Sequence, residues 1–516
     1  MGSSEIQRFR RLLSIGSDSI AYKVSEKKLD IARTRVVKAL ITEGKSDEVI
    51  NEIVSANTER RSIRREVLFQ SLAICAKSDN ETLKKKAHDA VVEICSTPAE
   101  LFLFLNASKT LTDSTKGWGR SQRTAVSRWY NTRTSKELVE LVTRFKSRAG
   151  WSHRDVFRLA HLKADSDDVA VIFKYVVKGL EAAKSEFAEN TAEDVQSVLK
   201  YLEAVEIVKH SEDHHQIAML IEQFKFYKEH IPTPAHNSTE VWGALIKDMT
   251  ITEVLQNVGK LASIGFLSES TPTVSFFLEK VTNESDIKEQ KVQPFVVFHA
   301  SQIYEQVPVK GKKKWTKNPA VTEALRKTFK TALEYYPPTE KRFLIAIKVG
   351  TPTLRPAKHT NVLTPVLVSS ALSYIINWKE EHCQLGSIGT KLVPLVIPKA
   401  ASLEKYHEEI TKGVIPNPYK LHCPITWAGD NDRKVDVFII LTDVPISQRE
   451  FRDDPSLKEA LEQYRSRMNM PKAKLVICGL TGTTNFPDVD DPDILDVSGF
   501  DATAAEVINK FITDSF

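Results

Sequence analysis

Cysteine is scarce in this chain of 516 residues, and its five cysteines show no C-x-x-C spacing. They are Cys75, Cys95, Cys383, Cys423 and Cys478. An odd number of widely scattered cysteines excludes a disulfide scaffold and argues against a cysteine-based zinc module. Such cysteine usage fits a reducing compartment, so we expect a cytoplasmic protein, with the nucleus as a second compartment.

Long apolar runs are also missing. The chain contains no run of about 18 apolar residues, and its basic first residues, 1–11, are not followed by the apolar segment of a secretory signal. Hydrophobic content of 41% and charged content of 27% are ordinary for a globular protein, which excludes a largely disordered or collagen-like chain. We therefore expect a soluble monomer without a membrane partner.

The common catalytic signatures are absent, because the sequence holds no G-x-x-x-x-G-K-[ST], G-x-S-x-G or H-E-x-x-H. Residues 478–484 carry two glycines after a strand but lack the lysine of a phosphate-binding loop. His210, His214 and His215 fit exposed histidines better than a metal site, and the acidic run 488–493 fits a surface turn better than a calcium site. We expect neither an enzyme nor a cofactor, and a nuclease is the least favoured alternative.

The hydrophobic pattern divides the chain into two parts. Between about residues 25 and 330, apolar residues recur at three- and four-residue spacing, which predicts one helix after another. The helical units recur at about 40 residues, a period typical of helix-pair repeats that bury a core by stacking on their neighbours. This pattern predicts a ring or solenoid of helical repeats, and periodicity fits the two equally well.

The pattern changes after Tyr336-Pro337-Pro338, where two prolines end the preceding helix. Continuous apolar strands then alternate with helices, which indicates a doubly wound parallel sheet covered on both faces. We predict strands at 343–349, 392–397, 435–441 and 474–479, and helices at 365–378, 446–467 and 502–512. The first of these helices is expected to begin with Thr364 as N-cap and Pro365 as first residue. The chain is thus predicted to be α + α/β, with a helical-repeat domain at 1–338 and an α/β domain at 339–516.

Positive charge is concentrated in one region of the chain. The formal net charge is +5 for the whole chain, and it separates into +7 for residues 1–338 and −2 for the remainder. The segment from Lys109 to Lys163 alone has thirteen basic and four acidic residues, a net charge of +9, with eight arginines against five lysines. Trp118, Trp129 and Trp151 are interleaved with them. Arginine pairs bidentately with phosphate and stacks on bases, so this mixture favours RNA binding.

Local spacing predicts how some of these cations are presented. Arg144 and Arg148 are four residues apart, which would place both on one face of a helix. The candidate RNA contacts are the basic side chains of this region, Arg120, Arg123, Arg144, Arg148, Arg154, Arg158, His161 and Lys163. A solvated basic face is the alternative for any one of these arginines.

Ser152 and Asp155 have the spacing of a capping box, so a new helix is expected at His153. On that helix Arg154, Arg158 and His161 would follow i, i+4 and i+7 and form one polar stripe. A second basic element, Lys310–Lys317, is expected as an exposed loop. A nuclear-localisation signal, a phosphate-binding loop and a linker all remain open for it.

Several blocks are together similar to the TROVE module of the Ro autoantigen family, the proteins of small Y RNA ribonucleoproteins. They are Gly117-Trp118-Gly119-Arg120, Trp129-Tyr130-Asn131, residues 150–155 and residues 161–163. The likeness continues at the boundary after residue 336 and near the C-terminus, so it covers nearly the full chain.

This resemblance implies a ring of HEAT-like helical repeats closed by a von Willebrand factor A-type α/β domain. It implies Y RNA binding on the outer surface, with single-stranded 3′ ends of misfolded non-coding RNAs taken through the central hole, for RNA stability and quality control. The family's Y RNA contacts correspond to Arg144, Arg148 and His161, the first being lysine in the family. Protein partners through the α/β domain are also expected. The rival interpretation is a scaffold that uses both domains to bind polypeptides without RNA.

The A-type domain of such proteins normally holds a divalent cation through a D-x-S-x-S run, a threonine and an aspartate. Here Lys348, Gly350 and Pro352 stand in that run, and the threonine loop corresponds to residues 417–419. Only Asp443 persists. We therefore predict no metal at this position and a pairing of Lys348 with Asp443.

Overall fold

The protein is described by a computed structural model that covers residues 4–26, 31–111, 117–306, 315–349, 356–360, 362–415, 418–443, 455–482 and 490–516. The chain forms two compact units. One comprises residues 12–16 and 29–249 and is called the helical unit. The other, called the sheet unit, comprises residues 1–11, 17–28 and 250–516. This division differs from the predicted boundary after residue 338, which stays a prediction.

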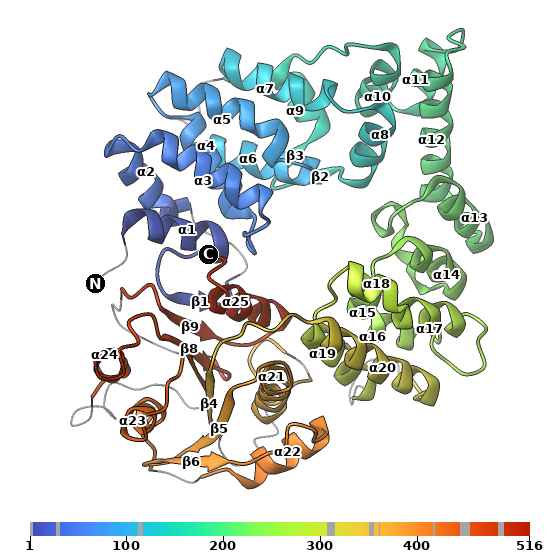
Figure 1. The fold of residues 1–516 in the computed structure, drawn as a ribbon. Helices are drawn as coiled ribbons and strands as arrows, with labels where there is room; N and C mark the ends of the chain where they lie inside the picture. The colour runs from blue at the N-terminus through green and yellow to red at the C-terminus, as the bar shows by residue number, and fades with distance from the viewer. Residues whose placement is uncertain are drawn as a thin grey trace. The chain divides into compact units, whose positions relative to one another are not determined.

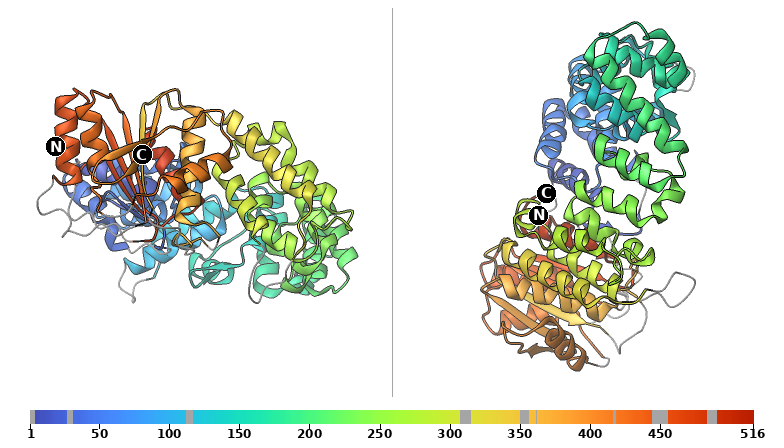
Figure 2. Two further views of the ribbon diagram at one scale, coloured as in Figure 1. Left: turned by 90° about the horizontal axis from the view of Figure 1, so that it is seen from below. Right: turned by 90° about the vertical axis from the view of Figure 1, so that its right-hand side faces the viewer.

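The helical unit is a succession of helices, each packed mainly on the next one or two along the chain. The green helices in the right-hand view of Figure 2 show this stacking. After α1 (Glu5–Ile15), whose residues are divided between the two units, the helices are α2 (Arg35–Thr42), α3 (Ser46–Thr58), α4 (Glu66–Ala76), α5 (Glu81–Ile94), α6 (Pro98–Thr110), α7 (Arg120–Asn131), α8 (Ser135–Arg144), α9 (His153–Ala160), α10 (Asp167–Lys178), α11 (Leu180–Glu186), α12 (Glu193–His210), α13 (His214–Phe224) and α14 (Thr239–Asp248). A short hairpin of β2 (Ser147–Arg148) and β3 (Trp151–Ser152) separates α8 from α9.

Local capping signals set where many of these helices begin. Asn80 accepts a hydrogen bond from the Leu83 amide at 3.1 Å at the start of α5. Thr97 and Glu100 form a reciprocal capping box at the start of α6. Helices therefore begin where short polar side chains satisfy the first free amides, and the helical pattern predicted up to residue 330 is confirmed.

The sheet unit begins with further helices and continues into an α/β fold (Figure 1). Its helices are α15 (Ile251–Gln256), α16 (Val258–Ser263), α17 (Val274–Thr282), α18 (Glu284–Glu289), α19 (Pro294–Glu305), α20 (Pro319–Tyr335), α21 (Pro365–Lys379), α22 (Leu403–Lys412), α23 (Cys423–Asp430), α24 (Leu457–Arg467) and α25 (Ala502–Ile512). Thr364 caps α21 and Pro365 is its first residue, as predicted.

Seven strands form one sheet in the order β1-β9-β8-β7-β4-β5-β6. The strands are β1 (Ala21–Lys23), β4 (Phe343–Lys348), β5 (Cys383–Ile388), β6 (Leu392–Leu395), β7 (Val437–Thr442), β8 (Lys474–Gly479) and β9 (Ile494–Ser498). All neighbours are parallel except β5 and β6, which are antiparallel. The predicted mostly parallel sheet with helices on both faces is confirmed (Figures 1 and 2).

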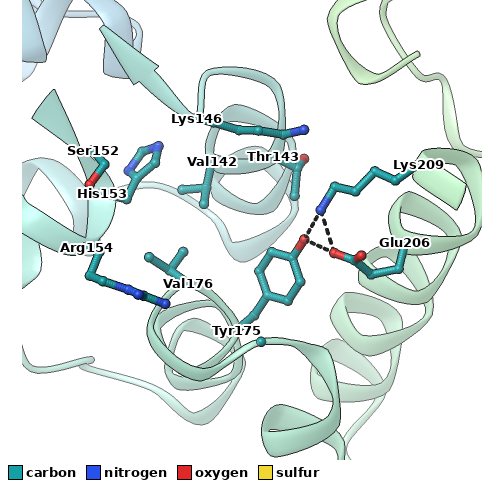
Figure 3. Close-up of a pocket in the computed structure, with 11 residues that line it drawn as sticks. Val142, Thr143, Lys146, Ser152, His153, Arg154, Tyr175, Val176, Glu206 and Lys209 are labelled. Atoms are coloured by element: carbon teal, nitrogen blue, oxygen red, sulfur yellow. Dashed lines mark hydrogen bonds and ion pairs between the residues drawn. The ribbon is translucent and has the colours of Figure 1, made fainter. Parts of the chain in front are cut away.

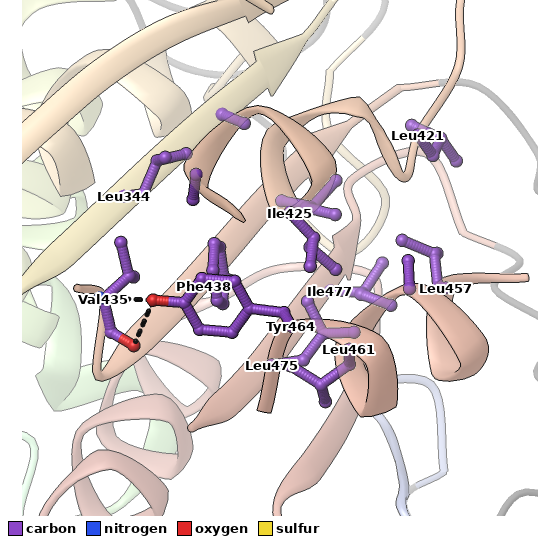
Figure 4. Packing of buried hydrophobic residues seen from close by; sticks show 14 of the residues in the cluster. Leu344, Leu421, Ile425, Val435, Phe438, Leu457, Leu461, Tyr464, Leu475 and Ile477 are labelled. Carbon is purple, nitrogen blue, oxygen red and sulfur yellow. Dashed lines mark hydrogen bonds between the residues drawn. The ribbon is translucent and has the colours of Figure 1, made fainter. Parts of the chain in front are cut away.

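One face of the sheet packs on α23 and α24 through a fully apolar core (Figure 4). Phe438 from β7 lies edge-on to Tyr464 from α24, with ring centroids 4.9 Å apart. The Tyr464 hydroxyl accepts from the Val435 amide at 2.6 Å and donates to the Arg433 carbonyl at 2.8 Å. These bonds satisfy the chain where it enters β7 and fix α24 against the sheet.

Three strands of this sheet were not expected from the apolar pattern. β1 has three residues and comes from a segment assigned to the helical domain, yet it pairs in parallel with β9. β5 begins with Cys383 and Gln384 and contains Gly386, and β9 is interrupted by Asp496. Each is too short or too polar to stand out, and only pairing within the sheet makes it a strand. The predicted helix at 446–467 is observed from Leu457, and residues 444–454 lie outside the described residues.

Candidate nucleic-acid interface

Arg144 and Arg148 do not share a helix, so the prediction that they lie on one helical face is wrong. Helix α8 ends at Arg144, and the backbone leaves the helix at Phe145 with φ −109° and ψ 73°. Arg148 lies on β2, which pairs with β3 through a turn at Ala149 and Gly150. Both turn residues have positive φ, 51° and 77°, as a tight two-residue hairpin requires. The hairpin therefore presents Arg148 in solvent beside the end of α8.

Helix α9 begins as predicted, but it ends one residue too early for the predicted stripe. Ser152 and Asp155 form the reciprocal capping box at its start. Arg154 and Arg158 are exposed on the helix. His161 is the left-handed C-cap, with φ 53° and ψ 49°, so it is not the i+7 member of a helical face. The helix ends there because the backbone turns into a conformation that cannot continue it.

A buried histidine anchors the root of the hairpin. His153 is 3% exposed, and its Nε2 lies 2.9 Å from the Phe145 carbonyl oxygen. Because a carbonyl only accepts, Nε2 carries the proton, and Nδ1 accepts from the Tyr130 hydroxyl at 2.8 Å. Burial lowers the pKa of His153 to about 4, and the hydrogen bond to the Phe145 carbonyl acts in the opposite direction. A neutral imidazole thus ties the hairpin to α7.

Aromatic rings surround this histidine and continue to the hairpin. Phe102 and Phe157 pack on His153, with ring centroids 5.0 and 6.2 Å away. On the other side of the hairpin Trp118 and Trp151 are 5.7 Å apart, so the segment before α7 contacts β3. The aromatic residues interleaved with the cations therefore form a packed layer beneath them. Trp129 in this layer is fully buried.

Arg144 is held in place on this surface. Its Nε donates to Glu229 Oε2 at 2.9 Å, and its guanidinium lies 3.8 Å above the ring of Tyr227. The side chain is 21% exposed. The neighbouring His230 is buried, and burial and the charge of Arg144 lower its pKa to about 4. Arg144 is thus oriented by stacking, and Glu229 would have to yield for it to bind another anion.

The remaining candidates are exposed basic side chains that show no acidic partner among the described residues. Arg123 donates to the Trp118 carbonyl at 3.0 Å, and Arg154 donates to the Val177 carbonyl at 2.8 Å. The segment after α9 is joined to α7, because the Asn131 amide donates to the Lys163 carbonyl at 3.0 Å. The exposed side chains of this set are Arg120, Arg123, Arg148, Arg154, Arg158, His161 and Lys163. With Arg144, we call them the basic surface.

A pocket of about 430 Å³ opens beside the hairpin between α8, α9, α10 and α12 (Figure 3). It brings Lys146 and Arg154 together with Lys209, Glu206 and Tyr175. Lys209 donates to the Tyr175 hydroxyl at 2.7 Å and also to the Glu206 carboxylate. The sequence pattern did not single out these last three residues, because they lie on α10 and α12 and join the hairpin only through packing.

In the sheet unit, the position where the fold implies the first ligand of a divalent cation is occupied by Lys348. Lys348 is buried, its ammonium donates to the Ile415 carbonyl at 2.6 Å, and it lies 5.0 Å from the ring centre of Tyr419. Burial lowers the pKa of Lys348, while the negative charge of Asp443 raises it, so the two groups interact electrostatically. An ammonium where the first carboxylate ligand would be does not fit a metal. Gly350 and Pro352 lie outside the described residues.

Members of two other polar clusters noted in the sequence are paired within the protein. His215 lies 2.6 Å from Glu240, and Asp491 accepts from Arg465 at 2.6 Å. The lysines at 310–314 lie outside the described residues. Among the helices that the structure describes, none is both long and apolar enough to cross a membrane.

The sequence matches two family models and proteins of known name. Residues 4–358 match the family model described as the TROVE domain, and residues 342–512 match the one described as the Ro60 vWA domain. The chain is 28% identical to the RNA-binding protein RO60 of Caenorhabditis elegans, over 99% of this chain and 88% of that protein. It is also 28% identical to the protein of the same name in Deinococcus radiodurans, over 98% and 92% of the two chains.

A solved structure supports the same relationship. The chain superimposes on the crystal structure of the Deinococcus radiodurans RO (RSR) protein with a TM-score of 0.87 and 26% sequence identity. The match covers 99% of this chain and all of that one. The likeness in sequence and in fold therefore extends over both units.

Proposed function

The chain belongs to the TROVE-domain family, and on that premise we propose that it is an RNA-binding protein that holds structured RNA on the basic surface of α7, α9 and the hairpin. Relatives that match nearly its full length are named RNA-binding proteins. The observation that carries the proposal is the exposure of guanidinium groups that have no acidic partners among the described residues. They lie above a buried layer of aromatic rings and the neutral His153. Phosphates would supply the missing anions.

We further infer a role in a small Y RNA-type ribonucleoprotein. Arg144, Arg148 and His161 would contact the Y RNA, with Arg120, Arg123, Arg154, Arg158 and Lys163 as additional contacts. Single-stranded 3′ ends of misfolded non-coding RNAs would enter the central hole that the family resemblance implies, in RNA stability and quality control. The protein would act by binding, as a cytoplasmic monomer, with protein partners through its α/β domain. The support is the correspondence of Arg144, Arg148 and His161 with the family's RNA contacts, and the exposure of the other basic side chains on the same surface.

Filter binding of a Y RNA over a range of salt concentrations tests the proposal. Replacing Arg144 and Arg148 together by alanine should weaken binding by about tenfold or more and reduce the salt slope by about 2, because two phosphate contacts are lost. Lys85→Ala with Lys200→Ala removes the same charge from two exposed sites of the helical unit outside the basic surface and is the matched control.

Unchanged affinity of the arginine variant would refute the assignment of these two residues. If the full chain binds no RNA at any salt concentration but captures polypeptides, the rival interpretation as a protein scaffold replaces the proposal. RNA cleavage products that depend on Mg²⁺ would instead indicate a nuclease.

A further inference from the structure

The pocket in Figure 3 carries more positive than negative charge. Lys146, Arg154 and Lys209 line it, and Glu206 is the one carboxylate among its lining residues. Lys209 and Glu206 pair with each other, and hydrogen bonds from Lys209 and Tyr175 outweigh burial and hold the pKa of Glu206 below its ordinary value. The single carboxylate is therefore already matched, and two cations remain in excess.

Lys146 is an exposed cation that lines the pocket. No hydrogen bond or ion pair of its ammonium is found among the described residues. Burial, followed by the positive charge of Lys209, lowers its pKa, and Glu206 compensates only in part. An anion bound beside Lys146 would relieve its repulsion with Lys209.

Arg154 adds a directed donor on another side of the pocket. One of its guanidinium nitrogens donates to the Val177 carbonyl at 2.8 Å, which orients the group at the start of α9. Its other N–H groups have no acceptor among the described residues. A guanidinium fixed in this way suits a phosphate, which accepts from two parallel N–H groups.

Two valines and an aromatic ring give the pocket apolar walls. Val142 and Val176 face one another across it, and the ring of Tyr175 closes a third side (Figure 3). The Tyr175 hydroxyl is tied to Lys209 and Glu206, so the ring is held in one orientation. A volume of about 430 Å³ falls within the usual range for small-ligand sites, about 300–1,000 Å³. A flat aromatic or heterocyclic group fits these walls better than a polar chain.

We propose that this pocket takes a single unpaired nucleotide of the bound RNA, with its base against Tyr175 and Val176 and the phosphates on its two sides on Lys146 and on Arg154. The inference rests on the proposed RNA binding. It adds a site for one structural element of the RNA, a bulged or looped-out nucleotide. Its position on the hairpin that also carries Arg148 favours a nucleotide within an RNA strand, since the same RNA can contact both. A base-stacking site is tolerant of sequence, so the preference should be for the unpaired state rather than for one base.

Fluorescence anisotropy with the full chain and two RNA stems tests this. The stems have the same paired sequence, and one carries a single bulged uridine. The wild-type protein should bind the bulged stem about tenfold more tightly, the gain expected from stacking one base. Val176→Trp, which fills the pocket without changing charge, and Lys146→Gln should each abolish most of this preference. Lys200→Gln, an exposed lysine on α12 outside the pocket, is the matched control and should keep it.

A second measurement does not depend on how well a variant folds. A 4-thiouridine at the bulge of the same RNA should photo-crosslink to wild-type protein within the peptide that contains Tyr175, and the paired 4-thiouridine should not. Crosslinks confined to other peptides would overturn the proposal.

The outcomes separate the pocket from the proposed function. Equal binding of both stems by the wild-type protein, or an equal loss for both stems in Lys146→Gln, would refute the nucleotide pocket while leaving RNA binding intact. Failure to bind either stem would refute the proposed function itself. Binding of free uridine 5′-monophosphate as tight as that of the bulged stem would identify the ligand as a free nucleotide and overturn the RNA assignment.

Discussion

The sheet unit and the basic surface of the helical unit use cationic side chains in opposite ways. In the sheet unit, Arg342 makes two hydrogen bonds of 2.8 Å to Asp436, one to each carboxylate oxygen. Arg465 donates to Asp491 at 2.6 Å and to the Ala473 carbonyl. These cations are partly or mostly withdrawn from water, and each has an acceptor positioned for it. Their charge is used to hold the α/β fold together.

In the helical unit the basic surface is arranged the other way. Arg148, Arg154 and Arg158 are exposed and have no acidic partner among the described residues. Beneath them lies a packed layer of aromatic rings and the neutral His153. The comparison shows that the number of cationic residues does not reveal their role. Their role depends on whether each cation is already paired with a carboxylate of the protein. Three predictions would break or sharpen this contrast.

The largest effect is expected from Arg465→Met in the sheet unit. Asp491 is 6% exposed, so removal of Arg465 leaves a buried carboxylate without its ion-pair partner, and the nearby Arg11 donates to the Asp491 carbonyl instead. We expect the free energy of unfolding to fall by about 3–5 kcal/mol, measured by urea denaturation. RNA affinity at temperatures where the variant is folded should not change.

Arg467→Met is the control for this prediction. Arg467 pairs with Asp430 at 2.9 Å, but both side chains are more than half exposed. That variant should lose less than about 1 kcal/mol. Equal effects of the two substitutions would show that burial does not distinguish the ion pairs of this unit.

The second prediction concerns His153, the neutral histidine beneath the basic surface. His153 has a folded-state pKa of about 4, below the ordinary histidine value of about 6.5. Its contribution to stability is present in full above the ordinary value and is lost as the pH falls from there through the folded-state pKa. We expect this group to account for a loss of about 2 kcal/mol between pH 7 and pH 5. Urea denaturation at the two pH values measures it.

His153→Gln tests whether that loss comes from this residue. Glutamine retains a donor for the Phe145 carbonyl and an acceptor for the Tyr130 hydroxyl but does not titrate. The variant should be less sensitive to pH by the stated amount, whereas His214→Gln on the exposed start of α13 should behave like the wild type. The same pH dependence in all three proteins would contradict the prediction.

The smallest effect is expected from Glu229→Gln. Glu229 is the acidic partner of Arg144 on the basic surface, and the pair is partly exposed. Its removal frees Arg144 and takes away a charge that repels phosphate, so RNA affinity should rise by about two- to fivefold at low salt. Filter binding measures the change.

Glu222→Gln, which breaks an exposed pair with Lys247 elsewhere in the helical unit, is the matched control. Weaker RNA binding by Glu229→Gln would mean that the ion pair is needed to orient Arg144. Arg144 would then resemble the internally paired cations of the sheet unit.

Local signals in the sequence predicted much of the fold. The strand at 474–479 and the helix at 502–512 are observed with the predicted bounds, because continuous apolar runs and strong amphipathic stripes leave little choice of structure. The capping box at Ser152 and Asp155 correctly placed the start of α9. In these places neighbouring residues carry all the information that is needed.

The predictions that failed depended on where a helix stops. Spacing alone could not show that α8 ends at Arg144, since the hairpin turn at Ala149 and Gly150 and the bond from His153 to Phe145 decide it. In the same way, His161 is removed from its predicted stripe by a left-handed backbone conformation. Such ends are set by tertiary contacts as well as by propensity.

The sequence by itself determined that this protein has a helical region with a dense basic segment and an α/β region, because hydrophobic period and charge are properties of neighbouring residues. The choice of which cations are free was made only by the tertiary structure. Asp436 lies 94 residues from Arg342, and Glu229 lies 85 residues from Arg144. Likewise Lys146 and Lys209 line one pocket only because α8 and α12 pack together. Charge is encoded locally, but whether it is neutralised depends on distances that folding alone creates.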